Sequence, residues 1–484
     1  MVRNAPFLLA GLLFASSSLA QPLELTDCRI SAGPGAPSMK ARCGKLMRPL
    51  DPTGVVPGEV ELKVAVVPAL NLTPEPDPVV PIAGGPGQGS IQFYTSYSHA
   101  FEGVRRNRDI LLVDQRGTGG SSRMDCPVDD DLVEGQYSIE LTIEYTNDCL
   151  AQLPFDPRFF TTSVAVTDLE AVRVALGYPS LNLYGVSYGS RVAQHFARRF
   201  PGSTRTVVLD GVAPPQASLG PEIATESQKA VDNILARCAE DAACDERFPD
   251  VQETFAKLLT DLKASPVAIR VPDPNTGRPE DLSFGRGEFA VAIRLLAYHP
   301  NSMALMPLLI HEAGTGNFVP LGSQFKMTMV AMNDMLAIGM HNAVLCTEDI
   351  PFLDKTSIDY EGIEASYMGS LQLSALEAIC SVWPEGPIDE EFKVPLTTDI
   401  PVLLLSGDAD PITPPRYAEM AAVDLQNARH LIGRRQGHGQ IGVGCTRRVF
   451  AAFVDAADPA GLDAECLERS FVMPFFLGFS GPGP

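Results

Sequence analysis

One pentapeptide constrains this chain more than any other feature: Gly185-Val186-Ser187-Tyr188-Gly189. It directly follows a short apolar run at 181–184, which predicts a buried strand, and it precedes a helical pattern at 191–200. A serine on such a strand-to-helix turn has a strained backbone, and the flanking glycines remove side chains that would clash there. The hydroxyl then projects above the sheet, beside a helix N-terminus that favours developing negative charge. The context therefore predicts that Ser187 is a nucleophile.

Strand and helix patterns alternate along two separate stretches of the chain. In the first, we expect strands at 59–68 (with the alternation of an edge strand), 78–83, 109–114, 181–184 and 206–209, and helices at 164–176 and 191–200. Thr162 or Ser163 is the expected N-cap of the first helix. In the second stretch, we expect strands at 401–406 and 430–433 and helices at 417–425 and 447–454. Such alternation indicates an α/β fold with a mostly parallel, doubly wound sheet covered on both faces.

The long gap between the two stretches has a different pattern. Residues 216–396 are mostly helical, with expected helices at 227–240, 251–264 and 288–297 and a Pro/Gly-rich loop at 272–279. We interpret the gap as a helical cap inserted into one core. The expected organisation is a signal peptide at 1–20, the first part of the core at 21–215, the cap at 216–396 and the C-terminal part of the core at 397–484.

The N-terminal residues have the pattern of an export signal. Arg3 supplies a positive start, residues 7–14 are apolar, and Ser18-Leu19-Ala20 offers small residues to a signal peptidase. The apolar run is too short to span a bilayer, and no later segment is long and apolar enough. We therefore expect an exported mature chain, periplasmic or extracellular, that starts at Gln21 and has no membrane span.

Ten cysteines and a net charge of −22 add to this interpretation. An even cysteine count in an oxidising compartment predicts disulfides, and the grouping suggests five local bridges between sequential neighbours. Metal binding is not expected, because no CxxC pair or Cys/His cluster has zinc spacing. The acidic balance argues against nucleic acid as a partner.

A serine nucleophile needs a base, and in this kind of fold the histidine comes last in the chain. His438 lies in Gly437-His438-Gly439, a loop after the final long strand, where glycines permit close approach to the serine. His430 lies within the preceding strand, so we expect a structural role for it. His195 follows Ser187 on the same helix and is expected to point away from the hydroxyl.

The third member of a triad is a carboxylate at the end of a strand that precedes the histidine. The segment 403–411 offers Asp410, which we favour because Pro411 helps to fix its turn, and Asp408 as the alternative. Asp210, after the strand at 206–209, is a third and weaker candidate. For the oxyanion we expect the backbone N–H groups of Tyr188 and of Gly85, which lies in the glycine-rich turn 84–87. No cofactor is required by this set.

Several blocks resemble the proline iminopeptidase and tripeptidyl aminopeptidase group of serine exopeptidases, which have the α/β-hydrolase fold. These blocks are 83–87, 114–121, 185–189 and 407–414, and the stretch from Asp410 through His438 to Cys466 is similar to the tripeptidyl type, as is 346–349. Proline iminopeptidases proper have a histidine where this chain has Ala83, so the resemblance favours the exported tripeptidyl type.

The resemblance implies hydrolysis of short peptides from a free N-terminus, with Ser187, Asp410 and His438 as the triad and a cap that restricts the substrate to chain ends. An exopeptidase should bind the α-ammonium group through carboxylates, for which Glu348 and Asp349 are candidates; a role as surface charges of the cap stays open. We expect Arg116 to pin the loop that carries Gly85. The rival functions are an esterase or lipase on the same scaffold and a non-catalytic binding protein.

Overall fold

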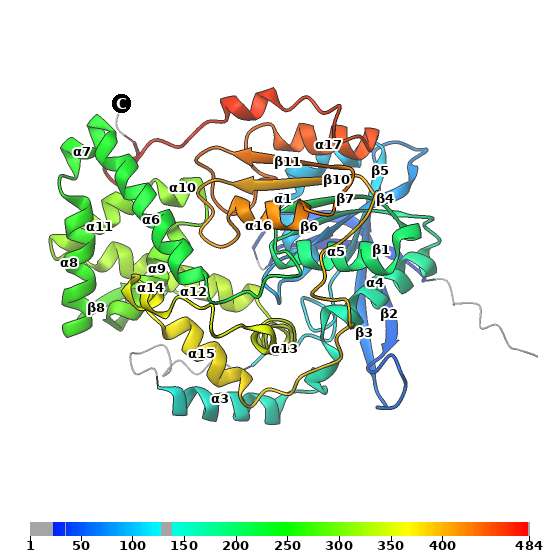
Figure 1. Ribbon diagram of the computed structural model, residues 1–484, viewed down its shortest axis with the longest axis horizontal. Helices are drawn as coiled ribbons and strands as arrows, with labels where there is room; N and C mark the ends of the chain where they lie inside the picture. Colours follow the sequence, from blue (N-terminus) through cyan, green and yellow to red (C-terminus); the bar gives the residue numbers. More distant parts are fainter. Residues whose placement is uncertain (1–22, 34, 127–137, 483–484) are drawn as a thin grey trace, which may run out of the picture.

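The computed structural model describes residues 23–33, 35–126 and 138–482, so the predicted signal peptide lies outside the described residues. In this part of the chain, one nine-stranded sheet runs through the molecule in the order β1-β2-β3-β5-β4-β6-β7-β10-β11 (Figure 1). Its strands are β1 (Thr26–Ser31), β2 (Ser38–Pro49), β3 (Glu59–Val67), β4 (Glu75–Ile82), β5 (Arg108–Val113), β6 (Leu181–Val186), β7 (Thr204–Asp210), β10 (Val402–Gly407) and β11 (Ala428–Gly433).

The sheet is mostly parallel. The six strands from β5 to β11 in the sheet order pair in parallel, while β1, β2 and β3 form an antiparallel extension that joins β5. The expectation that 59–68 is an edge strand was wrong, because β3 lies between β2 and β5. Its alternation arises because residues near its start are exposed on one face, although the strand has partners on both sides. The predicted α/β class with a parallel core is confirmed.

Helices cover both faces of the sheet and bury a separate apolar cluster on each. One cluster contains residues of α4 (Thr162–Leu176), α5 (Tyr188–Arg199) and α16 (Pro415–Ala422). The other contains residues of α1 (Ser90–Tyr97), α2 (Glu102–Arg105) and α17 (Thr446–Ala456). Helix α4 begins at Thr162 with Thr161 as its N-cap, one residue before the first predicted cap. The two-face packing holds the strand ends rigid, which is what a site at those ends requires.

Between β7 and β10 the chain forms a layer that lies to one side of the sheet (Figure 1). Its helices are α6 (Ile223–Glu240), α7 (Ala242–Arg247), α8 (Val251–Ala264), α9 (Arg286–Leu296), α10 (Pro300–Met303), α11 (Met306–Gly314), α12 (Val319–Met335), α13 (Ile338–Glu348), α14 (Tyr360–Ala365) and α15 (Leu371–Cys380). A hairpin of β8 (Val267–Pro272) and β9 (Pro279–Phe284) surrounds the Pro/Gly-rich turn and was not predicted. This layer has an apolar core of its own.

Five disulfides join sequential cysteines, as the grouping predicted: Cys28–Cys43, Cys126–Cys149, Cys238–Cys244, Cys346–Cys380 and Cys445–Cys466. Each bridge ties neighbouring segments: the first joins β1 to β2, and the fourth joins α13 to α15. Helix α3 (Ile139–Gln152) carries Cys149 and packs against α15. Among the described helices, none has the length and apolar character needed to cross a membrane.

Candidate active site

The nucleophile turn has the strained geometry that its sequence predicts. Ser187 joins β6 to α5 with φ 56° and ψ −126°, outside the regions that most residues adopt. A Cβ on Gly185 would lie 2.2 Å from the carbonyl oxygen of Gly189, and one on Gly189 would lie 2.2 Å from the carbonyl oxygen of Ile82. Only glycine fits at both positions, so the pentapeptide is required by the sharp turn itself.

His438 and Asp410 meet at the same edge of the sheet. The Nδ1 atom of His438 lies 2.8 Å from Oδ2 of Asp410, which follows β10 and is 4% exposed. The other carboxylate oxygen, Oδ1, accepts the backbone N–H groups of Ile412 (2.8 Å) and Thr413 (2.9 Å). The hydroxyl of Thr413 donates to Oδ2 (2.8 Å) and also lies 3.1 Å from Nδ1 of His438. The carboxylate is thus fixed by its own turn and aimed at the imidazole.

This pairing changes the pKa values of both groups. Burial alone would lower the pKa of His438, but the Asp410 carboxylate outweighs it and raises the pKa above the ordinary value of 6.5. For Asp410, burial would raise the pKa, but the His438 charge and the hydrogen bonds to the carboxylate lower it below 3.8. Asp410 therefore stays ionised and stabilises a proton on His438, which is the role of the acid in a triad.

The other sequence candidates lie in different environments. Asp408 is exposed, and its carboxylate accepts the backbone N–H of Arg435. The Nε2 atom of His430 lies 2.9 Å from the Ser406 hydroxyl, and that of His195 lies 2.8 Å from Asp389. The structure thus gives both histidines partners away from the serine, as the sequence suggested.

The glycine-rich turn 84–87 lies directly against the nucleophile. A Cβ on Gly84 would lie 2.9 Å from Cβ and 3.5 Å from Oγ of Ser187. Gly85 has φ +109°, and a Cβ there would approach the backbone nitrogen of Gly87 to 2.8 Å. Tyr188, the other expected oxyanion donor, is the first residue of α5. The two residues expected to supply the N–H donors therefore lie next to Ser187, Gly85 in the adjacent turn and Tyr188 in the first turn of α5.

Two family models match this chain. One, described as "alpha/beta hydrolase fold", matches residues 77–306, and another, described as "TAP-like protein", matches residues 365–466. The chain has the α/β-hydrolase fold. It is a serine hydrolase, and the predicted resemblance to the proline iminopeptidase and tripeptidyl aminopeptidase group is confirmed.

Relatives of this hydrolase include peptidases. It is 27% identical over 465 residues to the serine protease Hip1 of Mycobacterium tuberculosis, covering 85% of this chain and 84% of the relative. It is 29% identical over 168 residues to a tripeptidyl aminopeptidase of Streptomyces coelicolor, covering 30% and 31% of the two chains. A solved proline iminopeptidase of Mycobacterium smegmatis aligns with 86% of this chain and 98% of that one, at 15% identity and a TM-score of 0.39.

Glu348 and Asp349, at the end of α13 in this hydrolase, are both fully buried. The Glu348 carboxylate accepts the backbone N–H (2.6 Å) and the hydroxyl (2.9 Å) of Thr162, so it caps the start of α4. Asp349 pairs with Nη1 of Arg191 on α5 at 2.9 Å and accepts the N–H of Leu219 at 2.7 Å. Their alternative role as surface charges is therefore wrong.

Burial gives the Glu348 region unusual electrostatics. It raises the pKa of Glu348 to about 7, against the lowering effect of Arg191 and of the hydrogen bonds from Thr162. The Thr162 hydroxyl lies 2.6 Å from that of Tyr188, which also accepts a hydrogen bond from Gln115 at 3.0 Å. This polar network was not predicted, because its members are separated along the chain and share no local pattern. It links α13 to the residue that follows the nucleophile.

Arg116 does not pin the loop of Gly85, contrary to expectation. Its guanidinium instead forms an ion pair with Asp168 (2.7 Å) and donates to the carbonyl oxygens of Leu50 and Phe159. Another residue of the 114–121 block, Asp114, supports the start of α1, which follows the loop of Gly85. Its carboxylate accepts the backbone N–H of Ile91 (2.9 Å). The long arginine side chain reaches the Asp168 carboxylate on α4 and carbonyl oxygens that precede α4 or follow β2, whereas the shorter Asp114 reaches the adjacent helix α1.

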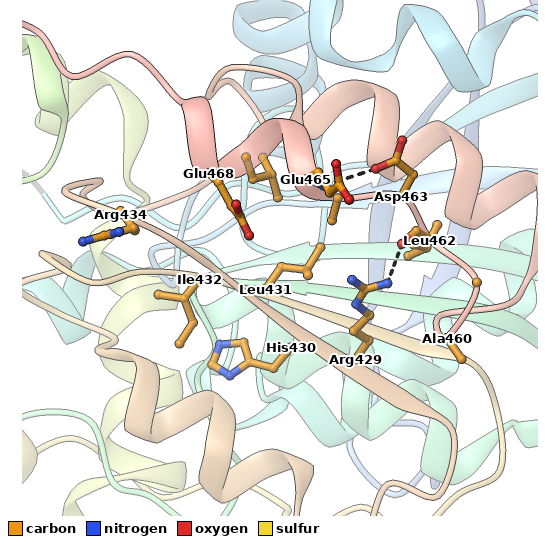
Figure 2. A pocket seen from close by; sticks show the side chains of 13 residues that line it. Arg429, His430, Leu431, Ile432, Arg434, Ala460, Leu462, Asp463, Glu465 and Glu468 are labelled. Atoms are coloured by element: carbon orange, nitrogen blue, oxygen red, sulfur yellow. Dashed lines mark hydrogen bonds between the residues drawn. The ribbon is translucent and has the colours of Figure 1, made fainter.

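A hollow of about 930 Å³ lies elsewhere, between the outer strand β11 and the segment 460–468 (Figure 2). Among the described residues, its lining includes His430 but neither Ser187 nor His438. Arg429 and Leu462 both line the hollow, and the Arg429 guanidinium donates to the carbonyl oxygen of Leu462, as Figure 2 shows. The size of this hollow does not by itself identify a reaction site, and Asp410 also lies outside its lining.

Proposed function

We propose that this protein is an exported serine exopeptidase that removes N-terminal residues or tripeptides from short peptides with a free N-terminus. The observation that carries the proposal is the buried pair of Asp410 and His438, with 2.8 Å between Oδ2 and Nδ1, at the edge of the sheet where Ser187 follows β6. The TAP-like match over 365–466 includes both members of this pair. Two relatives, the serine protease Hip1 and the tripeptidyl aminopeptidase, are named as peptidases and support peptides as the substrate class.

The proposed cycle assigns one role to each group. His438 takes the proton of the Ser187 hydroxyl as the oxygen attacks the scissile carbonyl. The backbone N–H groups of Gly85 and Tyr188 stabilise the tetrahedral oxyanion. His438 then protonates the leaving amine, and a water molecule, deprotonated by the same imidazole, hydrolyses the acyl-enzyme. Asp410 holds the imidazole and its charge throughout, and the cycle uses no metal or cofactor.

Export is supported by the five disulfides, since such bridges persist in oxidising compartments. The predicted signal at 1–20 adds to this support from the sequence. We propose the periplasm or the medium as the location, and peptides from the surroundings as the substrates. Nucleic acid is not proposed as a partner, because the net charge is −22.

An esterase on the same scaffold is the second candidate, and the burial of Glu348 and Asp349 favours it. Both side chains are 0% exposed and bonded within the protein, so recognising an α-ammonium group through them requires a rearrangement of the cap. The triad and the oxyanion donors serve esters and amides alike. The third candidate, a binding protein without activity, predicts that Ser187 does not react.

A paired substrate panel tests the proposal. Purified mature protein is given prolyl and alanyl amides, a free tripeptidyl amide, its N-acetylated twin and short-chain esters. We expect cleavage of a free amide and its loss on acetylation, with no turnover by Ser187→Ala. Equal cleavage of the acetylated twin would remove the exopeptidase assignment, and cleavage of esters alone would favour the second candidate. Turnover by Ser187→Ala at the wild-type rate would end the proposed mechanism.

A further inference from the structure

Asp210 is a buried carboxylate that the proposed cycle does not use. It ends β7, which lies between β6 and β10, and it is 0% exposed. Its backbone carbonyl accepts the N–H of Ser187 at 2.8 Å. The main chain of Asp210 therefore holds the nucleophile residue itself, at the point where its backbone is strained.

The carboxylate of the same residue faces the loop that carries the base. It accepts the backbone N–H of Gln440, at 2.7 Å to Oδ1 and 2.9 Å to Oδ2, and the N–H of Ile441, at 2.9 Å to Oδ2. The hydroxyl of Tyr184 on β6 donates to Oδ2 at 2.7 Å. Every one of these partners is a donor, and an ionised carboxylate is an acceptor only, so the ionised form satisfies all of them.

The next residue brings the imidazole against the same strand end. Gly211 has φ +59°, and its N–H donates to the carbonyl oxygen of Leu405 on β10 at 2.9 Å. A Cβ at this position would lie 3.0 Å from Cε1 of His438. The His438 ring therefore packs on the backbone that immediately follows Asp210, and Gln440 is only two residues away along the loop.

We propose that Asp210 is a positioning residue for catalysis: its main chain holds Ser187, and its carboxylate holds the loop that carries His438. The inference rests on the proposed roles of Ser187 and His438. One residue thus fixes the position of the nucleophile relative to the base, although these two residues lie about 250 positions apart in sequence. We call this double contact of Asp210, with Ser187 and with the loop of His438, the clamp. Small displacements of reacting groups cost about 100-fold in rate, so loss of the clamp should slow the reaction of Ser187.

The charge of Asp210 also acts on the base. His438 is faced by Asp410, by Asp210 and by Arg294 of α9; the two carboxylates raise its pKa, and Arg294 lowers it. Asp210 is faced by Tyr184, by Tyr97 of α1 and by His438. Burial raises the pKa of Asp210 to about 6, and the hydrogen bonds from Tyr184 and the loop N–H groups oppose that rise. Removing the charge should therefore make His438 less basic.

The test is the rate at which a fluorophosphonate labels Ser187, measured from pH 5 to 9. This reaction needs the activated serine but not the peptide-binding subsites, so it does not depend on the substrate class. Asp210→Asn keeps the shape of the side chain but replaces one acceptor oxygen by an NH₂ group. This group would face the donors of the loop or of Tyr184, so at least one hydrogen bond is lost. We expect labelling to slow by about 10- to 100-fold and its acid limb to move to lower pH. Asp408→Asn, an exposed aspartate in the neighbouring loop, is the matched control and should equal the wild type.

Wild-type rate and an unchanged acid limb in Asp210→Asn would overturn the clamp. If this variant does not fold, Tyr184→Phe provides the second test, because it removes one donor to Asp210 and leaves the ring packing. Losing that donor raises the pKa of Asp210, so less negative charge faces His438 and the imidazole becomes less basic. The acid limb should therefore move to lower pH, in the same direction as in Asp210→Asn; an unmoved limb overturns the inference. A wild-type protein that is not labelled would remove the triad and the clamp together, whereas a labelled wild type with unaffected variants would remove the clamp alone.

Discussion

In the proposed cycle, the Asp410 carboxylate sets the pH range in which His438 acts as a base. The imidazole must be neutral to accept the serine proton, and its pKa in the folded protein lies above 6.5 because of Asp410. Activity should therefore fall as the pH drops through that raised value. Replacing Asp410 by asparagine removes the charge that favours the protonated ring, so the acid limb should move to lower pH.

The same change should reduce kcat by about 10⁴-fold, since the asparagine amide favours the wrong tautomer of the imidazole. Steady-state pH profiles with the best substrate of the panel measure both effects. Asp408→Asn tests the sequence alternative directly and should retain wild-type kcat. A kcat for Asp410→Asn within tenfold of wild type would show that another carboxylate supports His438.

At the scale of single residues, local context separates what was predictable from what was not. Ser187 and His438 lie in glycine-flanked turns, and Asp410 lies beside a proline at a strand end, so short-range chemistry marks all three. The contacts of Arg116 with Asp168 and of Glu348 with Thr162 span 52 and 186 positions. No local pattern encodes such pairs, which is why Arg116 was assigned to the wrong loop and Glu348 was considered only as a substrate contact or a surface charge.

Secondary-structure elements show the same division. The buried strands between helices were predicted because short apolar runs bounded by turn residues are typical of strands in the interior of a sheet. The N-terminal hairpin β1–β2 was missed, because its burial alternates weakly and much of it is exposed. The hairpin β8–β9 was missed for a similar reason, since most of its residues are partly or fully exposed. Elements whose burial depends on partners distant in sequence give weak periodic signals.

Helices α5 and α13 join the core to the cap layer through the ion pair of Arg191 and Asp349, in which both side chains are 0% exposed. Asp349→Asn would leave Arg191 as an uncompensated buried charge, so we expect the free energy of unfolding to fall by about 3 kcal/mol. Urea denaturation of the oxidised protein measures the loss. Asp261→Asn, which breaks an exposed pair with Lys257, should leave the midpoint unchanged.

A double variant separates charge from packing at this junction. Replacing both partners by apolar residues, as in Arg191→Met with Asp349→Leu, removes both charges of the pair and should recover part of the stability. Lys393, which lies 3.8 Å from Asp349, then loses its partner and limits the recovery. A double variant less stable than Asp349→Asn would mean that the junction depends on the hydrogen bonds of the pair, including those to Ala217 and Leu219. The turnover rate of the single variant Asp349→Asn also reports whether the cap must stay packed on the core for activity.

At the scale of the whole molecule, the disulfides connect stability to the compartment. Cys346–Cys380 closes a span of 34 residues and Cys238–Cys244 a span of 6. In the chain-entropy model, the first stabilises the fold by about 4 kcal/mol and the second by about 2 kcal/mol. Replacing both cysteines of the longer bridge by alanine should therefore lower the melting temperature more than the same change in the shorter one. Cys238, Cys244 and Cys346 are buried and Cys380 is partly buried, so the two bridges have similar environments.

Thermal unfolding of the two double variants, with and without reductant, measures this difference. Reductant should lower the melting temperature of the wild type more than that of either double variant, because the wild type has five bridges to lose and each variant has four. With all bridges reduced, the two variants should no longer differ through loop closure. Cys346–Cys380 also joins α13, which ends next to Asp349, to α15. Its loss should therefore loosen the cap at the junction with α5. A larger effect of the shorter bridge would mean that packing around α6 and α7, and not chain entropy, limits the stability of this hydrolase.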